Sequence, residues 1–370
     1  MGSKDRKGNF FDDFRLGQVI RHGTPRTVTE GDCSLYIALT GSRHAAHSSL
    51  TIARQLGYAS RPVDDLLAFN IAFGKTVPDI SLNAVANLGY AEMRFLQPVY
   101  AGDTIRCESK VIGLKENSNG KTGVVYVRST SYNAQDEAVL AWVRWVMVHR
   151  APGATKTTEQ LVPELAAVVH PDQLVAHARI RGRRMLEDWC DATGSDDLWD
   201  DYAAGERINH PLGVTVEEAD HMTATRLYQN NSRPHFDALE MRHSKVGRRL
   251  VYGGHVISTC RALSYDGLEN AISMLAVNGG THAAPTVAGD TLYAYSEVID
   301  RWRLPGRVDA GALRLRLVGL KNVRPEDIAP HRDGEKHPAV VLDLDYTVLM
   351  PRRQSGPRHH ALARAPTPMK

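Results

Sequence analysis

The chain repeats itself, and this repeat limits the folds that it can adopt. A shift of 188 residues lays segment 12–47 on segment 200–235, and a shift of 187 residues lays 98–109 on 285–296. The recurring residues include Asp12, Gly17, His22, Thr27, Asp32 and His47, which meet Asp200, Gly205, His210, Thr215, Asp220 and His235. A solenoid repeat is shorter than a unit of about 150 residues, so we expect one duplicated domain.

Both units follow the same order of predicted elements. A turn-rich start leads to a short helix, and then to a mostly apolar central helix that follows 61–63 in the first unit and 249–251 in the second. Strands rich in β-branched residues come next, and the last of them lies at 139–148 or 340–349. One buried helix before several antiparallel strands predicts an α+β unit of the hot-dog type, in which a sheet wraps a central helix. The two tandem units are expected to pair as a pseudo-dimer.

These patterns divide the chain into four parts. We predict a first hot-dog unit at residues 1–150, a linker at 151–195, a second unit at 196–353 and a disordered tail at 354–370. The linker begins as a loop through Thr158, and a helix can form between Gln173 and Cys190. The tail is rich in Pro, Arg and His and lacks apolar periodicity.

The composition is that of a globular protein and gives no indication of a nucleic-acid or membrane partner. Apolar residues make up 42% of the chain, charged residues 24%, and the formal net charge is +3. Such a charge does not favour nucleic-acid binding. The sequence contains no run of 18 apolar residues and no signal-peptide core, so we expect no membrane partner. Cys33, Cys107, Cys190 and Cys260 are far apart. We expect reduced thiols in a cytoplasmic protein, with neither a metal site nor disulfides.

The stretch before each central helix resembles the signature of MaoC-like, (R)-specific enoyl-CoA hydratases. That signature holds an aspartate and a histidine five residues apart, which together activate water. Segments 40–47 and 228–235 keep the histidine as His47 and His235, but Ser42 and Asn230 replace the aspartate. The resemblance implies a tandem hot-dog hydratase with an altered catalytic pair.

Longer stretches resemble a narrower group, the mesaconyl-CoA (2-methylfumaryl-CoA) hydratases, also called β-methylmalyl-CoA dehydratases. They read GNFFDDFRLG at 8–17, FGKTVPD at 73–79, TRLYQN at 225–230, YGGH at 252–255 and LDYTVLMPRR at 344–353. The resemblance covers nearly the whole chain apart from the linker and the tail. It implies a hydro-lyase that reversibly hydrates mesaconyl-C1-CoA to β-methylmalyl-CoA without a cofactor. We also expect a homodimer.

Hydrating a 2-enoyl thioester requires a base for the attacking water, a donor for the enolate oxygen and an acid for C2. We expect His235 to be the base and then the acid, because histidine titrates near neutral pH. Asn230 would orient the water. The backbone N–H of Gly254, at the predicted start of the second central helix, would hold the enolate, and Gly253 would allow close approach.

The altered signature leaves two questions about the catalytic groups. Asn230 cannot be a base, so either His235 works alone or a carboxylate completes the pair, with Asp64, Asp65, Asp237 and Glu240 as candidates. His47 is a possible secondary base or a relic of the duplication. The first unit is expected to be degenerate and to supply part of the substrate channel.

The substrate that the resemblance implies also requires cationic residues. Mesaconyl-CoA has a free carboxylate on C4, which an arginine fork would match. Arg226 and Arg233 flank the segment 230–235 and are candidates for this contact. Arg248 and Arg249, just ahead of the second central helix, are candidates for the phosphates of CoA. A solvated surface position is the alternative for each of these four arginines.

Three other functions compete with this hypothesis. The chain can be a hydratase of another short enoyl-CoA, although the missing aspartate counts against assuming that activity. It can be a hot-dog thioesterase, for which Asp64 and Asp65 fit a carboxylate on or near the central helix. It can also be a non-catalytic acyl-CoA-binding protein that lost its catalytic pair.

Overall fold

The computed structural model describes residues 8–154, 159–329 and 337–353. The predicted tail at 354–370 and the end of the predicted loop, at 155–158, lie outside the described residues. None of the helices among the described residues is long and apolar enough to cross a membrane. All four cysteines are free in the structure, and three of them are buried.

The centre of the molecule is one antiparallel sheet of eleven strands. The first unit contributes β1 (Val19–Arg21), β2 (Arg26–Thr27), β3 (Ala84–Phe95), β4 (Thr104–Glu116), β5 (Thr122–Tyr132) and β6 (Ala138–His149), and the second contributes β7 (Arg207–Thr215), β8 (Ser273–Thr281), β9 (Thr291–Arg303), β10 (Ala310–Lys321) and β11 (Val340–Pro351). Their order is β1-β4-β5-β6-β3-β8-β11-β10-β9-β7, and β2 pairs with β4 at one edge. The two halves of this order mirror each other, which confirms the duplication.

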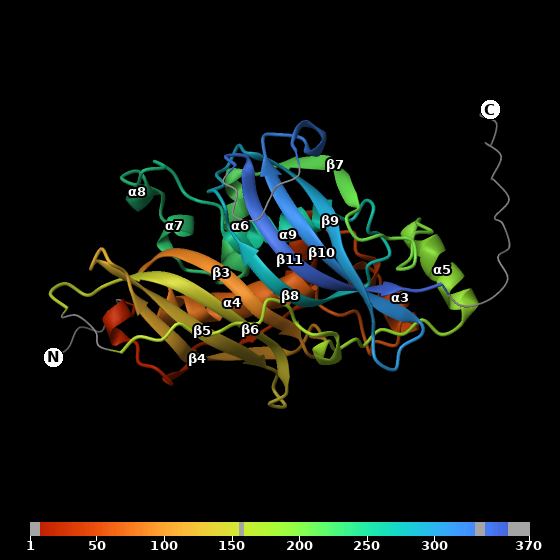
Figure 1. Ribbon diagram of the computed structural model, residues 1–370, viewed down its shortest axis with the longest axis horizontal. Helices are drawn as coiled ribbons and strands as arrows, with labels where there is room; N and C mark the ends of the chain where they lie inside the picture. Colours follow the sequence, from red (N-terminus) through yellow and green to blue (C-terminus); the bar gives the residue numbers. More distant parts are fainter. Residues whose placement is uncertain (1–7, 155–158, 330–336, 354–370) are drawn as a thin grey trace.

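The two half-sheets join edge to edge through β3 and β8. Tyr90 pairs with Gly280 and Arg94 with Ala276 across this junction. The pairing covers two strand edges that would otherwise expose unpaired backbone groups. The predicted pseudo-dimer is therefore one continuous sheet, which runs through both units (Figure 1).

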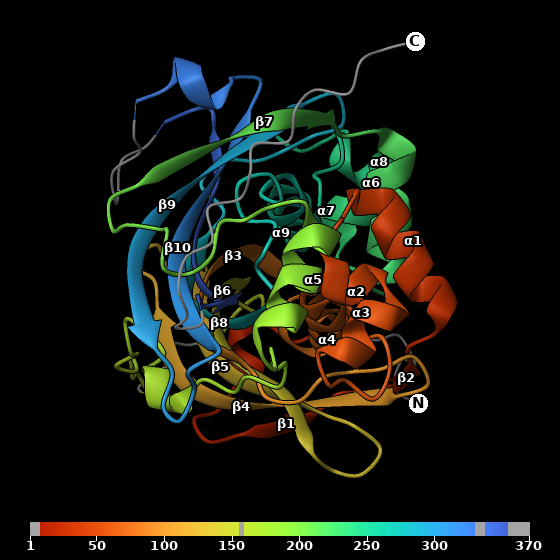
Figure 2. The ribbon, with the colours of Figure 1, turned by 90° about the vertical axis from the view of Figure 1, so that its right-hand side faces the viewer.

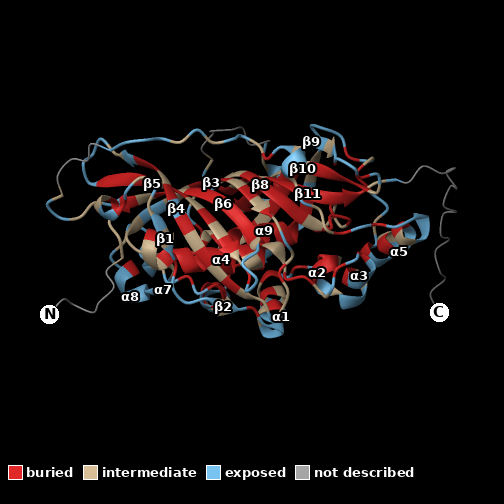
Figure 3. Ribbon diagram, turned by 90° about the horizontal axis from the view of Figure 1, so that it is seen from below, coloured by how far each residue is buried: buried red, intermediate tan, exposed pale blue. Residues whose placement is uncertain are grey.

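Helices fill the concave side of the sheet, which curves around them in Figure 2. The central helices are α4 (Asp65–Ile80) and α9 (Gly253–Leu263), and both begin where the sequence predicts. The other helices are α1 (Glu30–Thr40), α2 (Ala45–Ser48), α3 (Leu50–Gln55), α5 (Arg183–Thr193), α6 (Glu218–Leu227), α7 (Arg233–Phe236) and α8 (Ala238–Met241), with 3₁₀ turns η1 (Phe11–Asp13), η2 (Pro171–Gln173) and η3 (Pro325–Asp327). Figure 3 shows the buried residues gathered along the sheet and both central helices.

The repeat is also visible in single hydrogen bonds. Nε2 of His22 lies 2.8 Å from Ser109 Oγ, and Nε2 of His210 lies 2.8 Å from Ser296 Oγ. His22 directly follows β1 and pairs with β4, and His210 lies in β7 and pairs with β9. The recurring histidines at these two positions are thus buried structural residues rather than catalytic ones.

The two central helices pack against each other at the junction of the units. Asn70 of α4 donates to Ser258 Oγ at 3.0 Å and to the carbonyl of Gly254 at 3.3 Å. A Cβ atom on Gly74 would lie 1.9 Å from the carbonyl oxygen of Tyr228, so only glycine fits there. These contacts hold segment 228–230 of the second unit against the central helix of the first.

The helix in the linker begins later than the sequence indicates. Residues 174–182 are not helical, and α5 begins at Arg183. Gly182 has a φ of +86°, which interrupts helical geometry. The backbone before it makes hydrogen bonds to the two hot-dog units instead of to a helix. The N–H of Arg179 donates to the carbonyl of Leu56, and the N–H of Ile180 donates to Asp309. The linker is therefore packed onto both units.

Candidate active site

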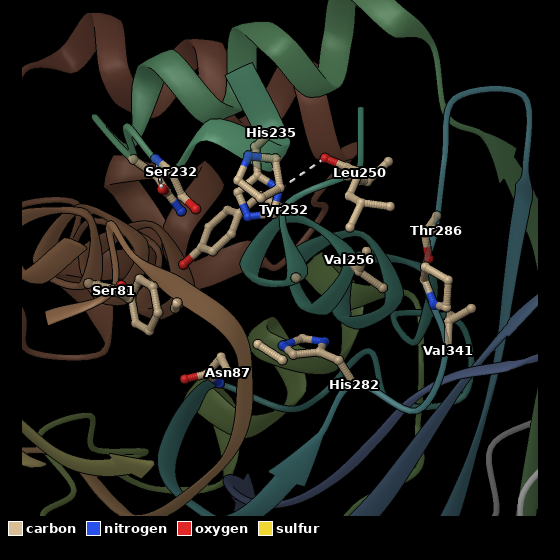
Figure 4. A pocket seen from close by; sticks show the side chains of 18 of the residues that line it. Ser81, Asn87, Ser232, His235, Leu250, Tyr252, Val256, His282, Thr286 and Val341 are labelled. Carbon is tan, nitrogen blue, oxygen red and sulfur yellow. Dashed lines mark hydrogen bonds between the residues drawn. The ribbon is translucent and has the colours of Figure 1, made fainter. Parts of the chain in front are cut away.

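A cavity of about 290 Å³ lies where the two units meet. The first unit provides one wall, from α4, β3 and β6, and the second provides the opposite wall, from the segments around α7, α9 and β8. Figure 4 shows residues of both units around it. The polar residues of the lining are Ser81, Asn87, Tyr90, Arg144, Asn230, Ser232, His235, Tyr252, His282 and Thr286.

His235 of α7 lines this cavity with its imidazole ring. Its Nδ1 lies 2.9 Å from the carbonyl oxygen of Leu250, the contact drawn as a dashed line in Figure 4. A carbonyl only accepts hydrogen bonds, so this contact requires the proton on Nδ1 and leaves a lone pair on Nε2. Burial lowers the pKa of His235 to about 4. The ring is therefore neutral near pH 7, with one nitrogen ready to accept a proton.

Asn230 lines the cavity three residues after the end of helix α6. The intervening Gln229 has a φ of +52°, which turns the chain towards the cavity. The Oδ1 atom of Asn230 accepts the N–H of Ser232 at 3.0 Å, so its oxygen is committed to the backbone. The amide Nδ2 is then the group that Asn230 can offer to a ligand.

The N-terminus of α9 reaches the cavity through Gly253. A Cβ atom on Gly253 would lie 2.4 Å from the ring of His282, and a Cβ atom on Gly254 would lie 2.0 Å from Asn70 Oδ1. A side chain at either position would therefore have to displace a neighbouring side chain. Among the described residues, no hydrogen bond uses the N–H of either glycine. These N–H groups, with the positive end of the helix dipole, form a site for a developing negative charge. Gly254 lies behind Gly253 and is not part of the lining.

Eight of these ten polar side chains were not predicted from the sequence, and four of the eight stand out. His282 lies against Gly253 and its Nε2 is 3.3 Å from the hydroxyl of Tyr90. Tyr252 caps α9 and packs 5.6 Å from the ring of His235. Asn87 and Arg144 come from β3 and β6 of the first unit. Of these four residues, only Tyr252 could have been found from the sequence, because it directly precedes the glycine pair 253–254.

The four arginines selected from the sequence lie outside this lining. Arg226 and Arg248 are exposed, Arg233 lies 3.9 Å from Glu240, and Arg249 pairs with Glu218 at 2.6 Å. The expectation that Arg226 or Arg233 meets the reacting carbons therefore has no support in the geometry. Both point outward because they occupy the solvent side of short helical segments.

The cavity lining contains no aspartate or glutamate among the described residues. Asp237 instead caps α8, accepting the N–H groups of Leu239 and Glu240. Asp64 caps α4, and Asp65 lies against His47 in the other unit. No carboxylate candidate from the sequence is therefore placed to complete a pair with His235.

His47 occupies the corresponding position of the first unit, without a comparable cavity. Its Nδ1 faces the carbonyl of Pro62 at 3.3 Å, and its Nε2 lies 3.4 Å from Asp65. Burial disfavours the charged ring, but the carboxylate of Asp65 outweighs burial and raises the pKa of His47 to about 9. The space beside His47 is about 10 Å³. Only the second unit's histidine therefore faces room for a ligand.

The fold and the site define the class of protein first. Two hot-dog units in one sheet, with a histidine facing the N-terminus of a central helix, make this a MaoC-like double hot-dog protein. The chain belongs to the mesaconyl-CoA hydratase family, whose model matches residues 2–328.

Two curated relatives match over almost all of the chain. A β-methylmalyl-CoA dehydratase of Chloroflexus aurantiacus is 54% identical over 95% of this chain and 100% of its own length. A mesaconyl-CoA hydratase of Cereibacter sphaeroides is 52% identical over 94% of this chain and 100% of its own length. These relatives confirm the family that the sequence resemblance indicated.

Solved structures confirm the fold. A MaoC-domain protein of Chloroflexus aurantiacus superposes with a TM-score of 0.92 at 54% identity, covering 95% of this chain and 100% of that chain. A double-hotdog protein of Mycobacterium tuberculosis superposes with a TM-score of 0.74 at 25% identity, covering 93% and 98%. The predicted tandem hot-dog architecture is thus shared by this chain and both structures.

Proposed function

We propose that this chain reversibly hydrates mesaconyl-C1-CoA to β-methylmalyl-CoA in the cavity around His235. The family and the two relatives above support this reaction. The observation that carries the site assignment is the neutral His235, whose Nε2 lone pair faces the same cavity as the N-terminus of α9. The reaction adds water and involves no net electron transfer, so the proposal requires no redox cofactor, and it assigns no step to a metal.

In the proposed steps, His235 transfers the proton and Asn230 orients the attacking water. Nε2 of His235 takes a proton from a water, whose oxygen bonds to C3 while the electrons of the C2–C3 double bond move to the thioester oxygen. The amide Nδ2 of Asn230 donates to that water and orients its lone pairs. The resulting imidazolium then returns the proton to C2, which restores the thioester. One water is added in total.

The N-terminus of α9 is the proposed site for the enolate oxygen. The N–H of Gly254 is the donor expected from the sequence, and that of Gly253 lies on the cavity wall. Both belong to the first turn of the helix, where N–H groups lack helical partners. The enolate oxygen develops its charge only during the reaction, so these donors favour the transition state over the ground state.

The alternatives from the sequence receive less support from the site. Asp64 and Asp65, which a thioesterase could use, lie outside the large cavity. A binding protein without activity would not require a histidine with an unused Nε2 beside a helix N-terminus. We also propose that Arg248 and Arg249, which directly precede the lining residue Leu250, meet the phosphates of CoA at the cavity mouth.

The test is to mix the purified chain with mesaconyl-C1-CoA and to follow the ultraviolet absorbance of the enoyl thioester. We expect the absorbance to fall and mass spectrometry to find a product heavier by one water. Release of free CoA thiol would instead identify a thioesterase. No change with either mesaconyl-C1-CoA or crotonyl-CoA, and no free thiol, would overturn the hydratase assignment.

The homodimer and the cytoplasmic location stay predictions. The comparisons name acyl-CoA enzymes but no assembly state. Light scattering on the purified chain would measure its mass in solution, for which we expect two copies.

A further inference from the structure

Arg144 is a buried arginine in the cavity wall, and the proposed reaction steps assign it no role. It lies in the middle of β6, and its side chain is 0% exposed. Its guanidinium stacks over the ring of Phe73 on α4, with 4.2 Å between Cζ and the ring centroid. Both residues line the cavity at the junction of the units.

The hydrogen bonds of Arg144 involve neutral partners. Its Nη2 donates to Thr76 Oγ1 at 2.8 Å, and Ser81 Oγ lies 3.4 Å from both Nη atoms. Its Nε has no partner, and no ion pair involves Arg144 within the described part of the chain. Burial lowers the pKa of Arg144 to about 10, so the side chain remains charged near pH 7.

A buried cation without a counterion destabilises the fold, because it loses its hydration and gains no compensating charge. An anion that arrives with a ligand would provide that compensation. The planar guanidinium fork matches a carboxylate, and Nε is one N–H that such a group could receive.

Two further polar side chains of the lining lack partners. Both amide atoms of Asn87, on β3, are buried without a hydrogen bond among the described residues, and so is the hydroxyl of Tyr252. Figure 4 shows Asn87 and Ser81 of the first unit and Tyr252 of the second unit around the same cavity. The carboxylate-free lining thus combines one cation with two additional donors, which favours an anionic ligand.

The other unit shows that the fold does not require an arginine at this place. Tyr346 on β11 corresponds to Arg144 on β6, because each lies opposite the matching residue of β8 or β3, Val277 or Tyr90. The residue that corresponds to Phe73 is Arg261, whose guanidinium lies 5.7 Å from the ring of Tyr346. The arginine and the aromatic ring have exchanged positions between the two units.

We propose that the guanidinium of Arg144 binds the free carboxylate of the acyl group and selects dicarboxylic monothioesters over neutral enoyl thioesters. This inference rests on the proposed function, since that carboxylate is bonded to C3, the carbon that water attacks. Holding it fixes C3 relative to His235, and Asn87 and Tyr252 are the further donors to it.

The test compares Arg144→Met with the wild type on two substrates that differ in one group. Mesaconyl-C1-CoA has the carboxylate, and (E)-2-methylbut-2-enoyl-CoA has a methyl group in its place. We expect Arg144→Met to lower kcat/KM for mesaconyl-C1-CoA by about 100- to 1,000-fold, the usual cost of removing one partner of a buried charge pair. We expect the neutral thioester to be hydrated, or to compete for the site, at least as well as with the wild type. Arg144→Lys should fall between the two.

The matched control is Arg128→Met on the neighbouring strand β5. Arg128 pairs with Glu92 at 2.6 Å and its side chain is 41% exposed, so its removal should leave both substrates unaffected. The thermal midpoint is a second readout. Because Arg144→Met removes an uncompensated buried charge, we expect the midpoint to stay or rise, whereas a purely structural role would lower it.

The outcomes separate the inference from the proposed function. If the wild type does not hydrate mesaconyl-C1-CoA, the proposed function fails. If the wild type is active and Arg144→Met loses activity equally on both thioesters, or keeps its preference for the dicarboxylic one, the carboxylate-binding role of Arg144 is overturned.

Discussion

His47 and His235 occupy the same position in the two units, yet the structure gives them opposite states. Each ring faces the carbonyl that precedes its central helix by three residues, Pro62 at 3.3 Å or Leu250 at 2.9 Å. The pKa of His47 is raised to about 9, whereas that of His235 is lowered to about 4. The same backbone therefore supports a buried cation in one unit and a neutral base in the other.

The cause of the difference lies in the first residue of each central helix. In the first unit it is Asp65, whose carboxylate contacts His47 and accepts the N–H of Met274 at 2.7 Å. In the second unit it is Gly253, which leaves the helix N-terminus open to a cavity of about 290 Å³. Duplicated sites can thus diverge through the start of a helix: Asp64 and Asp65 bring carboxylates to it in the first unit, whereas Tyr252 and Gly253 bring none in the second.

The largest effect should come from removing each histidine in turn. We expect His235→Ala to lower kcat by about 100- to 10,000-fold, since it removes the proposed general base and acid. His47→Ala should change kcat less than about twofold and lower stability instead, because it leaves the carboxylate of Asp65 without its cationic partner. Steady-state hydration of mesaconyl-C1-CoA and circular dichroism of both variants provide the measurement. A folded His235→Ala variant with near wild-type turnover would contradict the assignment.

Exchanging the helix-start residues should have the next largest effect. Gly253→Asp would displace His282 and place a carboxylate where the enolate develops, so we expect a loss of about 100-fold or more in kcat. Asp65→Gly should leave kcat close to wild type and lower the thermal midpoint. Combining Asp65→Gly with His235→Ala should not restore activity, because the space beside His47 is only about 10 Å³. Recovered turnover in that double variant would show that the first unit is a latent site.

The features predictable from the sequence are those that each unit contains by itself. The repeat and the apolar helices predicted the tandem hot-dog fold, and His235, Asn230 and Gly253 do line one cavity. Arg144 and Asn87 could not be found this way, because β6 and β3 reach the cavity only through the junction with the second unit. Arg226 and Arg233 were selected for closeness in sequence, which does not report the direction of a helical side chain.

The pH dependence should differ in sign between the two histidines. The lowered pKa of His235 stabilises the fold fully above pH 6.5, and this contribution is lost as pH falls from 6.5 towards 4. The raised pKa of His47 stabilises the fold fully below pH 6.5, and this contribution is lost as pH rises from 6.5 to about 9. Urea unfolding of His47→Gln should therefore show a larger destabilisation at pH 6 than at pH 9.5. His235→Gln should show a larger one at pH 7.5 than at pH 4.5. Equal pH slopes for both variants would contradict the two charge states.

The smallest effect should come from restoring the aspartate of the MaoC signature at Asn230. Asn230→Asp keeps an acceptor for the N–H of Ser232 but replaces the donating amide with a negative charge in a lining that has no other carboxylate among the described residues. That charge should raise the pKa of His235. We therefore expect kcat/KM to change by less than about tenfold, while the acid limb of its pH profile moves from near pH 4 towards neutral pH. Asn230→Ala, which cannot donate or carry charge, should lower kcat without moving that limb. If both variants gave the same unshifted profile, Asn230 would act by shape alone, and the loss of the aspartate from this unit would not explain why His235 stays neutral.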